Sequence, residues 1–302
     1  MTITERLRRG PVLLDGGLGS SLIARGLPAS ACAVLWNVER PAVVREVHAG
    51  YVRTGCDVIE ANTFAGNAIA LGDYGLAARM EELNAAGVRL ARAAAEEASA
   101  ARPVLVAGNL GPSGRFLAPV GDVDPRALED AFAAQAAALA AAGADYLAIE
   151  TMTDVQEALC ALRGAVAATR LPVTACLTFE RKRRGFFTLM GNRIEDAMRI
   201  LAGAGAVAVG ANCSIGSEAM REACPQLVAA SPVPVIVKPN AGLPEIVAGR
   251  PVYRQSPADF ARDVAAMAAA GAAAVGGCCG TDERFLAALR DELAAGTGGG
   301  AR

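Results

Sequence analysis

The sequence predicts an α/β protein with a (β/α)8 TIM barrel, in which each of eight parallel strands is followed by a helix. Two observations lead to this prediction. Short apolar runs alternate eight times with longer, alanine-rich stretches. Hydrophobic residues make up 53% of the 302 residues but aromatic residues only 4%, so small aliphatic side chains and many helices must form the core. One domain is expected over residues 1–295, followed by a disordered glycine-rich tail over 296–302.

Each predicted strand is a short apolar run that ends in a polar residue or in glycines. The eight runs are residues 11–17, 56–64, 104–108, 146–150, 173–179, 207–213, 235–238 and 272–276. The helices expected after them are residues 41–54, 76–101, 125–142, 155–169, 193–204, 218–230, 257–270 and 282–295. Pro41, Pro125 and Pro257 open their helices, and Gly55 ends the first one. The loop from Leu18 to Asn37 is expected to fold over the barrel mouth.

Charge and hydropathy argue against several functional classes. The formal net charge of −2, from 29 basic and 31 acidic side chains, leaves no electrostatic footprint for nucleic acid. The basic cluster Arg181–Arg184 is short and is interpreted as a solvated loop. No apolar run reaches the ~18 residues needed to cross a bilayer, and residues 1–10 lack the apolar core of a signal peptide. We therefore expect a cytoplasmic protein that binds neither nucleic acid nor membrane, with its oligomeric state left open.

Cysteine placement points to a metal. Eight cysteines in a cytoplasmic chain indicate metal binding or catalysis rather than disulfides, and the single histidine, His48, argues against a histidine-rich site. Cys278 and Cys279 end the last predicted strand and Cys213 ends the sixth, so the three sulfurs could converge over the barrel mouth. Three thiolates with an open fourth position are typical of a catalytic zinc site, because a structural site is closed by a fourth protein ligand. In the alternative interpretation, the cysteines are small apolar residues that fill the barrel end.

The other strand ends add polar side chains to the same face. Five further strands end in polar residues, namely Asp15, Asn62, Asn109, Glu150 and Asn240. Asp15 and Glu150 could hold a cation such as an α-ammonium group, unless they only cap loops. Backbone N–H groups at Gly280 and Thr281 could hold a carboxylate, because a helix is expected to begin there. A zinc ion among thiolates binds a further thiol as a nucleophilic thiolate, so these features together predict an amino-acid thiol as substrate.

Seven short motifs resemble the homocysteine S-methyltransferase family, over about residues 10–292. The motifs are Asp15-Gly16-Gly17-Leu18-Gly19-Ser20, Asn62-Thr63-Phe64, Gly108-Asn109-Leu110-Gly111-Pro112, Glu150-Thr151-Met152, Asn212-Cys213-Ser214, Lys238-Pro239-Asn240-Ala241-Gly242 and Gly276-Gly277-Cys278-Cys279-Gly280. The resemblance implies that zinc (Zn2+) is bound by Cys213, Cys278 and Cys279. It implies that homocysteine is bound by Asp15, Gly16 and Glu150, and it places Asn62 and Asn109 in the same substrate site.

The resemblance also implies the reaction, which is transfer of a methyl group to the homocysteine thiol to give methionine. Ala65 follows Asn62-Thr63-Phe64 where the betaine enzymes of the family resemble one another in having a tyrosine, whereas the run itself is similar to the methionine synthase domain. The expected donor is therefore a methylated corrinoid, methylcobalamin, carried by a separate partner protein. The alternatives are S-methylmethionine or another sulfonium or betaine donor, a different small thiol as acceptor, and a non-catalytic subunit that docks a corrinoid protein.

Overall fold

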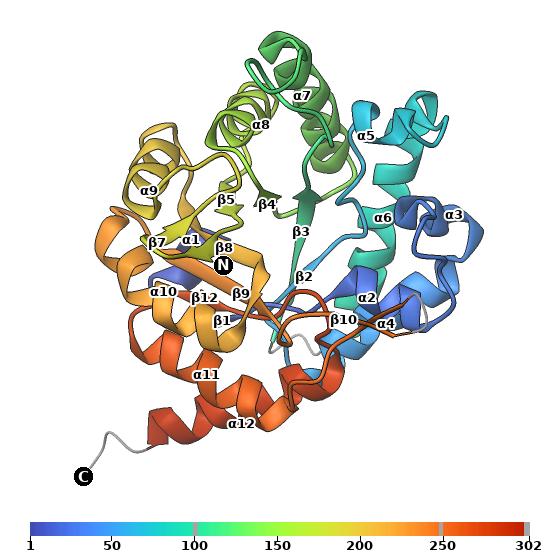
Figure 1. Cartoon of the computed structure of the whole chain (residues 1–302). Coiled ribbons are helices and arrows are strands. Elements are labelled where there is room, and N and C mark those ends of the chain that lie inside the picture. Colours follow the sequence, from blue (N-terminus) through green and yellow to red (C-terminus); the bar gives the residue numbers. More distant parts are fainter. Residues whose placement is uncertain (99–101, 248–249, 299–302) are drawn as a thin grey trace.

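The computed structural model describes residues 1–98, 102–247 and 250–298, and it forms the predicted barrel. Eight strands pair in parallel in the order β1-β12-β9-β8-β5-β4-β3-β2 (Figure 1). Their bounds are β1 Val12–Leu13, β2 Val58–Glu60, β3 Leu105–Leu110, β4 Tyr146–Met152, β5 Val173–Leu177, β8 Ala208–Gly216, β9 Val235–Asn240 and β12 Ala274–Val275. β1 and β2 form no ladder, but the backbone N–H of Asp57 donates to the carbonyl of Leu13 and nearly closes the ring.

Helices surround the strands, as Figure 1 shows. The main helices are α4 Pro41–Thr54, α6 Met80–Ala95, α7 Pro125–Ala141, α8 Val155–Ala168, α9 Ile194–Gly203, α10 Ser217–Ala230, α11 Pro257–Ala269 and α12 Glu283–Gly298. Shorter helices are α1 Ile3–Leu7, α2 Leu18–Ala24, α3 Trp36–Glu39 and α5 Ala68–Gly72, with 3-10 turns at Ala33–Leu35 and Ala77–Arg79. Among the described residues, no helix is long and apolar enough to cross a membrane.

Local sequence explains where the helices begin and end. Proline occupies the first turn of α4, α7 and α11, where a missing N–H costs nothing. Asp124, Asp154 and Ser256 accept hydrogen bonds from the free N–H groups of α7, α8 and α11. Gly55 ends α4 with a φ of 100°, which glycine adopts without strain. These are the local signals from which the repeated strand-helix units could be recognised in the sequence.

Several boundaries differ from the sequence-based expectation. The helix expected over 76–101 begins as a 3-10 turn and ends at Ala95, and residues 99–101 lie outside the described residues. α12 runs to Gly298, three residues into the tail predicted as disordered, because Gly296 weakens a helix by only about 1 kcal/mol and no proline follows it. Residues 299–302 lie outside the described part of the chain.

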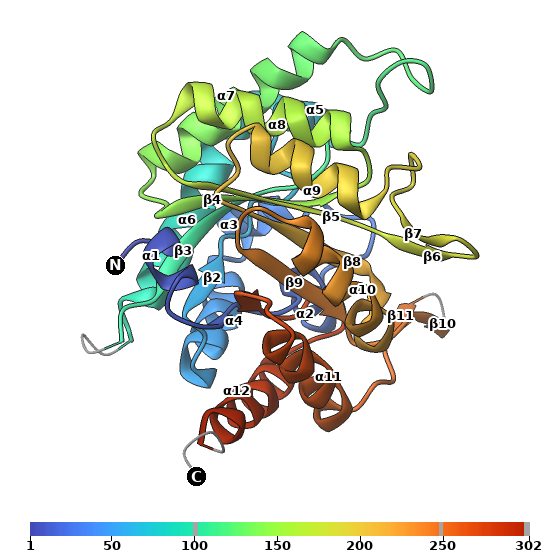
Figure 2. The same ribbon diagram turned by 90° about the vertical axis from the view of Figure 1, so that its left-hand side faces the viewer.

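Two antiparallel hairpins extend from the barrel and were not predicted. β6 (Glu180–Lys182) pairs with β7 (Gly185–Phe187), so the basic cluster expected as a solvated loop forms the exposed end of a hairpin. β10 (Glu245–Val247) pairs with β11 (Arg250–Val252). Figure 2 shows both hairpins at one end of the barrel and α1 at the other.

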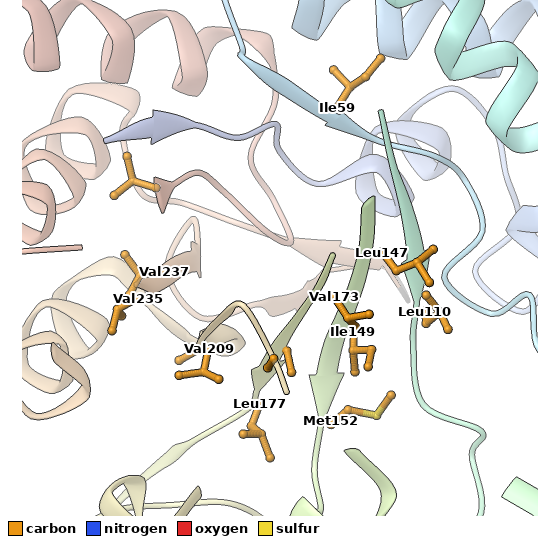
Figure 3. Close-up of a cluster of buried hydrophobic side chains, with 14 of the residues drawn as sticks. Ile59, Leu110, Leu147, Ile149, Met152, Val173, Leu177, Val209, Val235 and Val237 are labelled. Atoms are coloured by element: carbon orange, nitrogen blue, oxygen red, sulfur yellow. The ribbon is translucent and has the colours of Figure 1, made fainter. Parts of the chain in front are cut away.

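The strands alternate between two apolar environments. Side chains such as Ile59, Leu147 and Val209 pack with the surrounding helices in the largest buried cluster (Figure 3). Neighbouring positions such as Val58, Ala148 and Ile236 form a second cluster inside the barrel, which Ile3 and Leu7 of α1 join. The short amphipathic N-terminus thus closes the lower end of the barrel, a role that its sequence did not reveal. Cys176 also lies in this interior cluster.

Candidate active site

A cavity of about 330 Å3 opens where the strands end. Eight of the residues predicted to bind metal or substrate line it, namely Asp15, Gly16, Asn62, Asn109, Glu150, Cys213, Cys278 and Cys279. They come from the ends of six strands, so the barrel brings together residues that are up to 264 positions apart. Leu18, Ala33 and Val34 add an apolar wall, which confirms that the loop from Leu18 to Asn37 shapes the cavity.

The three sulfur atoms form a cluster that could hold a metal ion. The Sγ atoms of Cys213, Cys278 and Cys279 all lie within 4.8 Å of one another, and those of Cys213 and Cys279 are 3.7 Å apart. Thiolates that bind zinc tetrahedrally at about 2.3 Å lie about 3.8 Å apart, so the spacing suits such an ion. The three residues are half-buried, whereas the other five cysteines are buried.

The three thiols strongly affect one another's pKa values. Interaction with Cys278 and Cys279 lowers the pKa of the Cys213 thiol to about 3. The neighbouring Cys213 in turn raises the pKa of Cys279 to about 11 and that of Cys278 well above its ordinary value. A metal ion bound among the sulfurs would favour the thiolate form of all three, because metal binding displaces thiol protons.

Strained backbone positions direct these side chains. Thr151, Cys213 and Ser214 have φ values of 62°, 60° and 60°, which residues other than glycine rarely adopt. The ladders of β4 and β8 shift register at the same places. The side chain of Asn212 holds the two segments together: its Oδ1 accepts from the N–H of Thr151 at 2.7 Å, and its Nδ2 donates to Thr151 Oγ1 at 2.7 Å and approaches Cys278 Sγ at 3.9 Å. We attribute the strain to placement of Glu150 and Cys213 in the cavity.

Below the sulfurs, the top layer of the barrel interior is ionic. Glu60, Asn109, Glu150 and Lys238 each lie two positions after an apolar residue of the interior cluster, so strand periodicity points them inward. Lys238 Nζ lies 2.5 Å from Glu60 Oε1, 2.9 Å from Glu150 Oε1 and 3.7 Å from Asp15 Oδ1. Asn109 Nδ2 donates to Glu60 and Glu150 at 2.7 and 3.0 Å.

Burial controls the protonation of this layer. It raises the pKa of Asp15 to about 6, although Lys238 attracts the charged form. Burial and then Glu150 raise the pKa of Glu60 well above its ordinary value. Burial also acts against the charge of Lys238, but Glu150, Glu60 and Asp15 outweigh it and keep the lysine pKa well above its usual range. Buried groups with such perturbed pKa values are typical of functional sites.

Sequence reasoning missed Glu60, Lys238 and Asn212 as members of the site. It took Asn62 and Asn240 as the polar ends of β2 and β9, and both Glu60 and Lys238 lie two residues before them. The signal for Glu60 and Lys238 was the alternation of inward- and outward-facing side chains along each strand. A charged residue at an inward position of a parallel barrel strand cannot reach solvent and must have a partner inside the barrel.

The expected carboxylate site at Gly280 and Thr281 is wrong. The N–H of Gly280 donates to Ser20 Oγ at 3.1 Å, and that of Thr281 donates to the carbonyl of Cys278 at 3.1 Å. Thr281 Oγ1 also accepts from the N–H of Gly17. The Gly280 N–H therefore holds the cysteine loop against the first glycine motif, the Thr281 N–H closes a turn within the loop, and neither group is available to a ligand.

Asn62 lines the cavity but has internal partners. Its Nδ2 donates to the carbonyl of Ala33 at 2.7 Å and to Asn37 Oδ1 at 2.9 Å, and Asn37 Nδ2 donates back to the carbonyl of Asn62. These bonds tie the loop over the mouth to the end of β2. Asn240, another predicted strand end, is buried, and its Oδ1 has no hydrogen-bond partner among the described residues.

Comparison with known proteins places this site in a family. Residues 12–293 match the sequence profile of the family described as homocysteine S-methyltransferase. The chain belongs to the homocysteine S-methyltransferase family. This confirms the family that the motifs indicated and the class of enzyme.

Two relatives differ from each other in length. Methionine synthase of Mycobacterium tuberculosis is 33% identical over 280 residues, which are 88% of this chain but only 23% of that protein. The chain thus spans about a quarter of this relative. The homocysteine methyltransferase MmuM of Escherichia coli, in its metallated form, is 29% identical with a TM-score of 0.79, and the match covers 94% of this chain and 96% of MmuM.

A more distant likeness concerns the fold alone. Dihydropteroate synthase of Stenotrophomonas maltophilia aligns with a TM-score of 0.53 at 13% identity, over 98% of this chain and 94% of that protein. At that identity only the barrel architecture is shared.

Proposed function

We propose that this chain methylates the thiol of homocysteine to give methionine. The observation that carries the proposal is the pairing, within one cavity, of a three-sulfur cluster with a buried acidic layer. The first suits the thiol end of the substrate and the second its α-ammonium end. The family match and the likeness to the metallated MmuM support the same reaction.

The proposed metal is zinc, held by Cys213, Cys278 and Cys279. Bound there, zinc would take the substrate sulfur as a thiolate at neutral pH and leave it nucleophilic, because three thiolate ligands make the metal electron-rich. The thiols reach this state only where they remain reduced, so the proposal places the protein in the cytoplasm.

The chain's own residues would bind and orient the substrate. Asp15 would accept a hydrogen bond from the ammonium group and Glu150 would attract its charge, while Asn109 holds the Glu150 carboxylate in position with a 3.0 Å hydrogen bond. Gly16 lets the end of β1 pack closely against Thr281 and Leu286, because an added Cβ would lie 2.8 Å from Thr281 Oγ1 and from the Leu286 side chain. The apolar wall of Leu18 and Val34 would exclude water that competes for the methyl group.

The methyl donor we favour is a methylated corrinoid on a separate protein. The mycobacterial relative is a methionine synthase, and its name supports the donor that the Asn62-Thr63-Phe64 run implies. Loops that follow the strands expose apolar side chains that such a partner would cover, namely Phe64, Phe116, Val120, Leu189 and Leu243. A free sulfonium donor is the second candidate, because the match to the homocysteine methyltransferase MmuM supports homocysteine as the acceptor with either donor.

A methyl-transfer assay tests these proposals. Zinc-loaded protein and homocysteine would be offered methylcobalamin, S-methylmethionine or betaine in parallel, with methionine as the readout. Turnover with methylcobalamin alone would support a corrinoid partner, and turnover with S-methylmethionine would support a self-sufficient enzyme. Competition with other small thiols would define the acceptor.

The role of the sulfur cluster has its own test. Cys278→Ala should abolish both zinc binding and methyl transfer, because two thiolates leave the ion without its third anchor. Cys160→Ala is the matched control, since Cys160 is buried in α8 away from the cavity. Full activity of metal-free protein would contradict the proposed mechanism.

A further inference from the structure

Lys238 is an internal cation where the substrate's cation is expected to bind. Its side chain is 2% exposed, and its ammonium contacts carboxylates of β2 and β4 together with Asp15. It therefore has the same partners that the α-ammonium of an amino-acid thiol would seek. The two cations must share the acidic layer or exclude each other.

The hydrogen bonds of the layer show how it is shared. Glu60 and Glu150 each use one oxygen for Lys238 and the other for Asn109. Asp15 Oδ2 accepts from the backbone N–H of Glu60 at 2.8 Å. Asp15 Oδ1 is buried and has no hydrogen-bond partner among the described residues, with Lys238 Nζ 3.7 Å away. One carboxylate oxygen thus remains open in an otherwise occupied layer.

The charge of the layer leaves room for one more cation. With Glu60 protonated, as its raised pKa favours, Asp15, Glu150 and the Lys238 ammonium together carry a net charge of −1, and a buried net charge is costly unless a counterion arrives. A substrate ammonium supplies that counterion. A thiol that carried only an anionic group would meet repulsion instead.

We propose that Lys238 is a positioning residue that fills the space between Glu60 and Glu150 and confines the substrate ammonium to Asp15 Oδ1. The inference rests on the proposed function and deepens it. Because Lys238 occupies the space between Glu60 and Glu150, the substrate ammonium cannot enter it. Lys238 therefore sets how far the substrate enters the cavity and where its thiol meets the sulfur cluster. It thereby selects the chain length of the amino-acid thiol.

The test removes the internal cation together with its nearest carboxyl partner. In the double variant Lys238→Met/Glu60→Gln both side chains of that pair become neutral, Asp15 and Glu150 remain, and the site vacated by the lysine ammonium becomes accessible to the substrate. The Kd for homocysteine, measured by calorimetry, should be at most threefold that of wild type. The kcat should fall at least tenfold, because a misplacement of about 1 Å can reduce a rate 100-fold.

Substrate length supplies the decisive readout. The homologue 2-amino-5-mercaptopentanoate, which is one methylene longer, should gain at least tenfold in kcat relative to homocysteine when the wild type is replaced by the double variant. A structural ion pair would not move this ratio. An unchanged ratio with wild-type kcat, or weakened binding of both thiols, would overturn the inference.

Lys238→Arg keeps the charge and provides a second test if the double variant does not fold. The longer guanidinium should reach Asp15 and raise KM for homocysteine at least tenfold, and an unchanged KM would contradict the proposal. Wild-type protein serves as the reference throughout. If it methylates no amino-acid thiol, the proposed function is wrong and this inference falls with it; if it is active and the variants behave like it, only the inference is wrong.

Discussion

Gly17 offers a test of how closely the first glycine motif supports the metal centre. A Cβ added at Gly17 would lie 2.4 Å from Ser20 Oγ and 2.5 Å from the backbone carbonyl oxygen of Cys278. The serine side chain can rotate, but the carbonyl belongs to a loop that Thr281 holds through two bonds to the same oxygen. Relief to the 3.4 Å of ordinary contact requires a movement of about 0.9 Å.

Gly17→Ala should therefore displace Cys278 from its sulfur partners. We expect zinc affinity to fall about 10- to 100-fold, the effect typical of losing support around a ligand, and the methyl-transfer rate to fall about 100-fold. The assays are zinc titration against a chromogenic chelator and initial rates at saturating homocysteine. Thermal melting would show that the barrel itself is intact.

Gly19→Ala is the matched control, because nothing lies within 4 Å of the Cβ it would add. This variant should bind zinc and turn over within twofold of wild type. If Gly17→Ala did the same, the loop would be far softer than its hydrogen bonds indicate and the argument from close contact would be refuted.

Three further predictions concern a buried histidine, the thiols and the ammonium site. Burial lowers the pKa of His48 from 6.5 to about 4, so the unfolded chain takes up a proton that the folded chain refuses. The free energy of unfolding should fall as pH drops from 6.5 to 4, by about 3 kcal/mol more in wild type than in His48→Leu. Urea unfolding at several pH values measures it, and the same pH dependence in both proteins would contradict this prediction. In metal-free native protein, three of the eight thiols should react quickly with a thiol reagent and zinc should protect them, whereas rapid reaction of all eight would refute the cluster. Asp15→Asn should raise KM for homocysteine about 30-fold with little change in kcat, since a charged hydrogen bond contributes about 2 kcal/mol, and an unchanged KM would move the ammonium elsewhere.

Much of the site could be predicted because the barrel imposes a simple rule. Asp15, Glu150, Cys213, Cys278 and Cys279 all stand at strand ends, and parallel strands deliver their ends to one face. The rule needs only the positions of the strands, which alternating apolar and helical runs reveal. It does not depend on knowing which strands are neighbours.

The same rule could not show which of the neighbouring positions face the barrel interior. Finding Glu60 and Lys238 required knowing which alternate residues of each strand point inward, because a shift of one residue sends a side chain outward to the helices. The role of Asn212 could be recognised only from its contact with Thr151, which lies 61 residues away in the sequence. Donor groups that were expected to be free, at Gly280 and Thr281, were already occupied by Ser20 and Cys278.

By itself, the amino-acid sequence determined the repeated strand-helix units, the family and the face on which the three thiols gather. Periodicity, helix capping and glycine placement are local properties, and each is written in a few consecutive residues. Only the tertiary structure decided which charges are paired and which carboxylate oxygen remains open. Pairing depends on distances of 2.5 to 3.7 Å between residues from four strand ends, and such distances are set by the closed barrel as a whole.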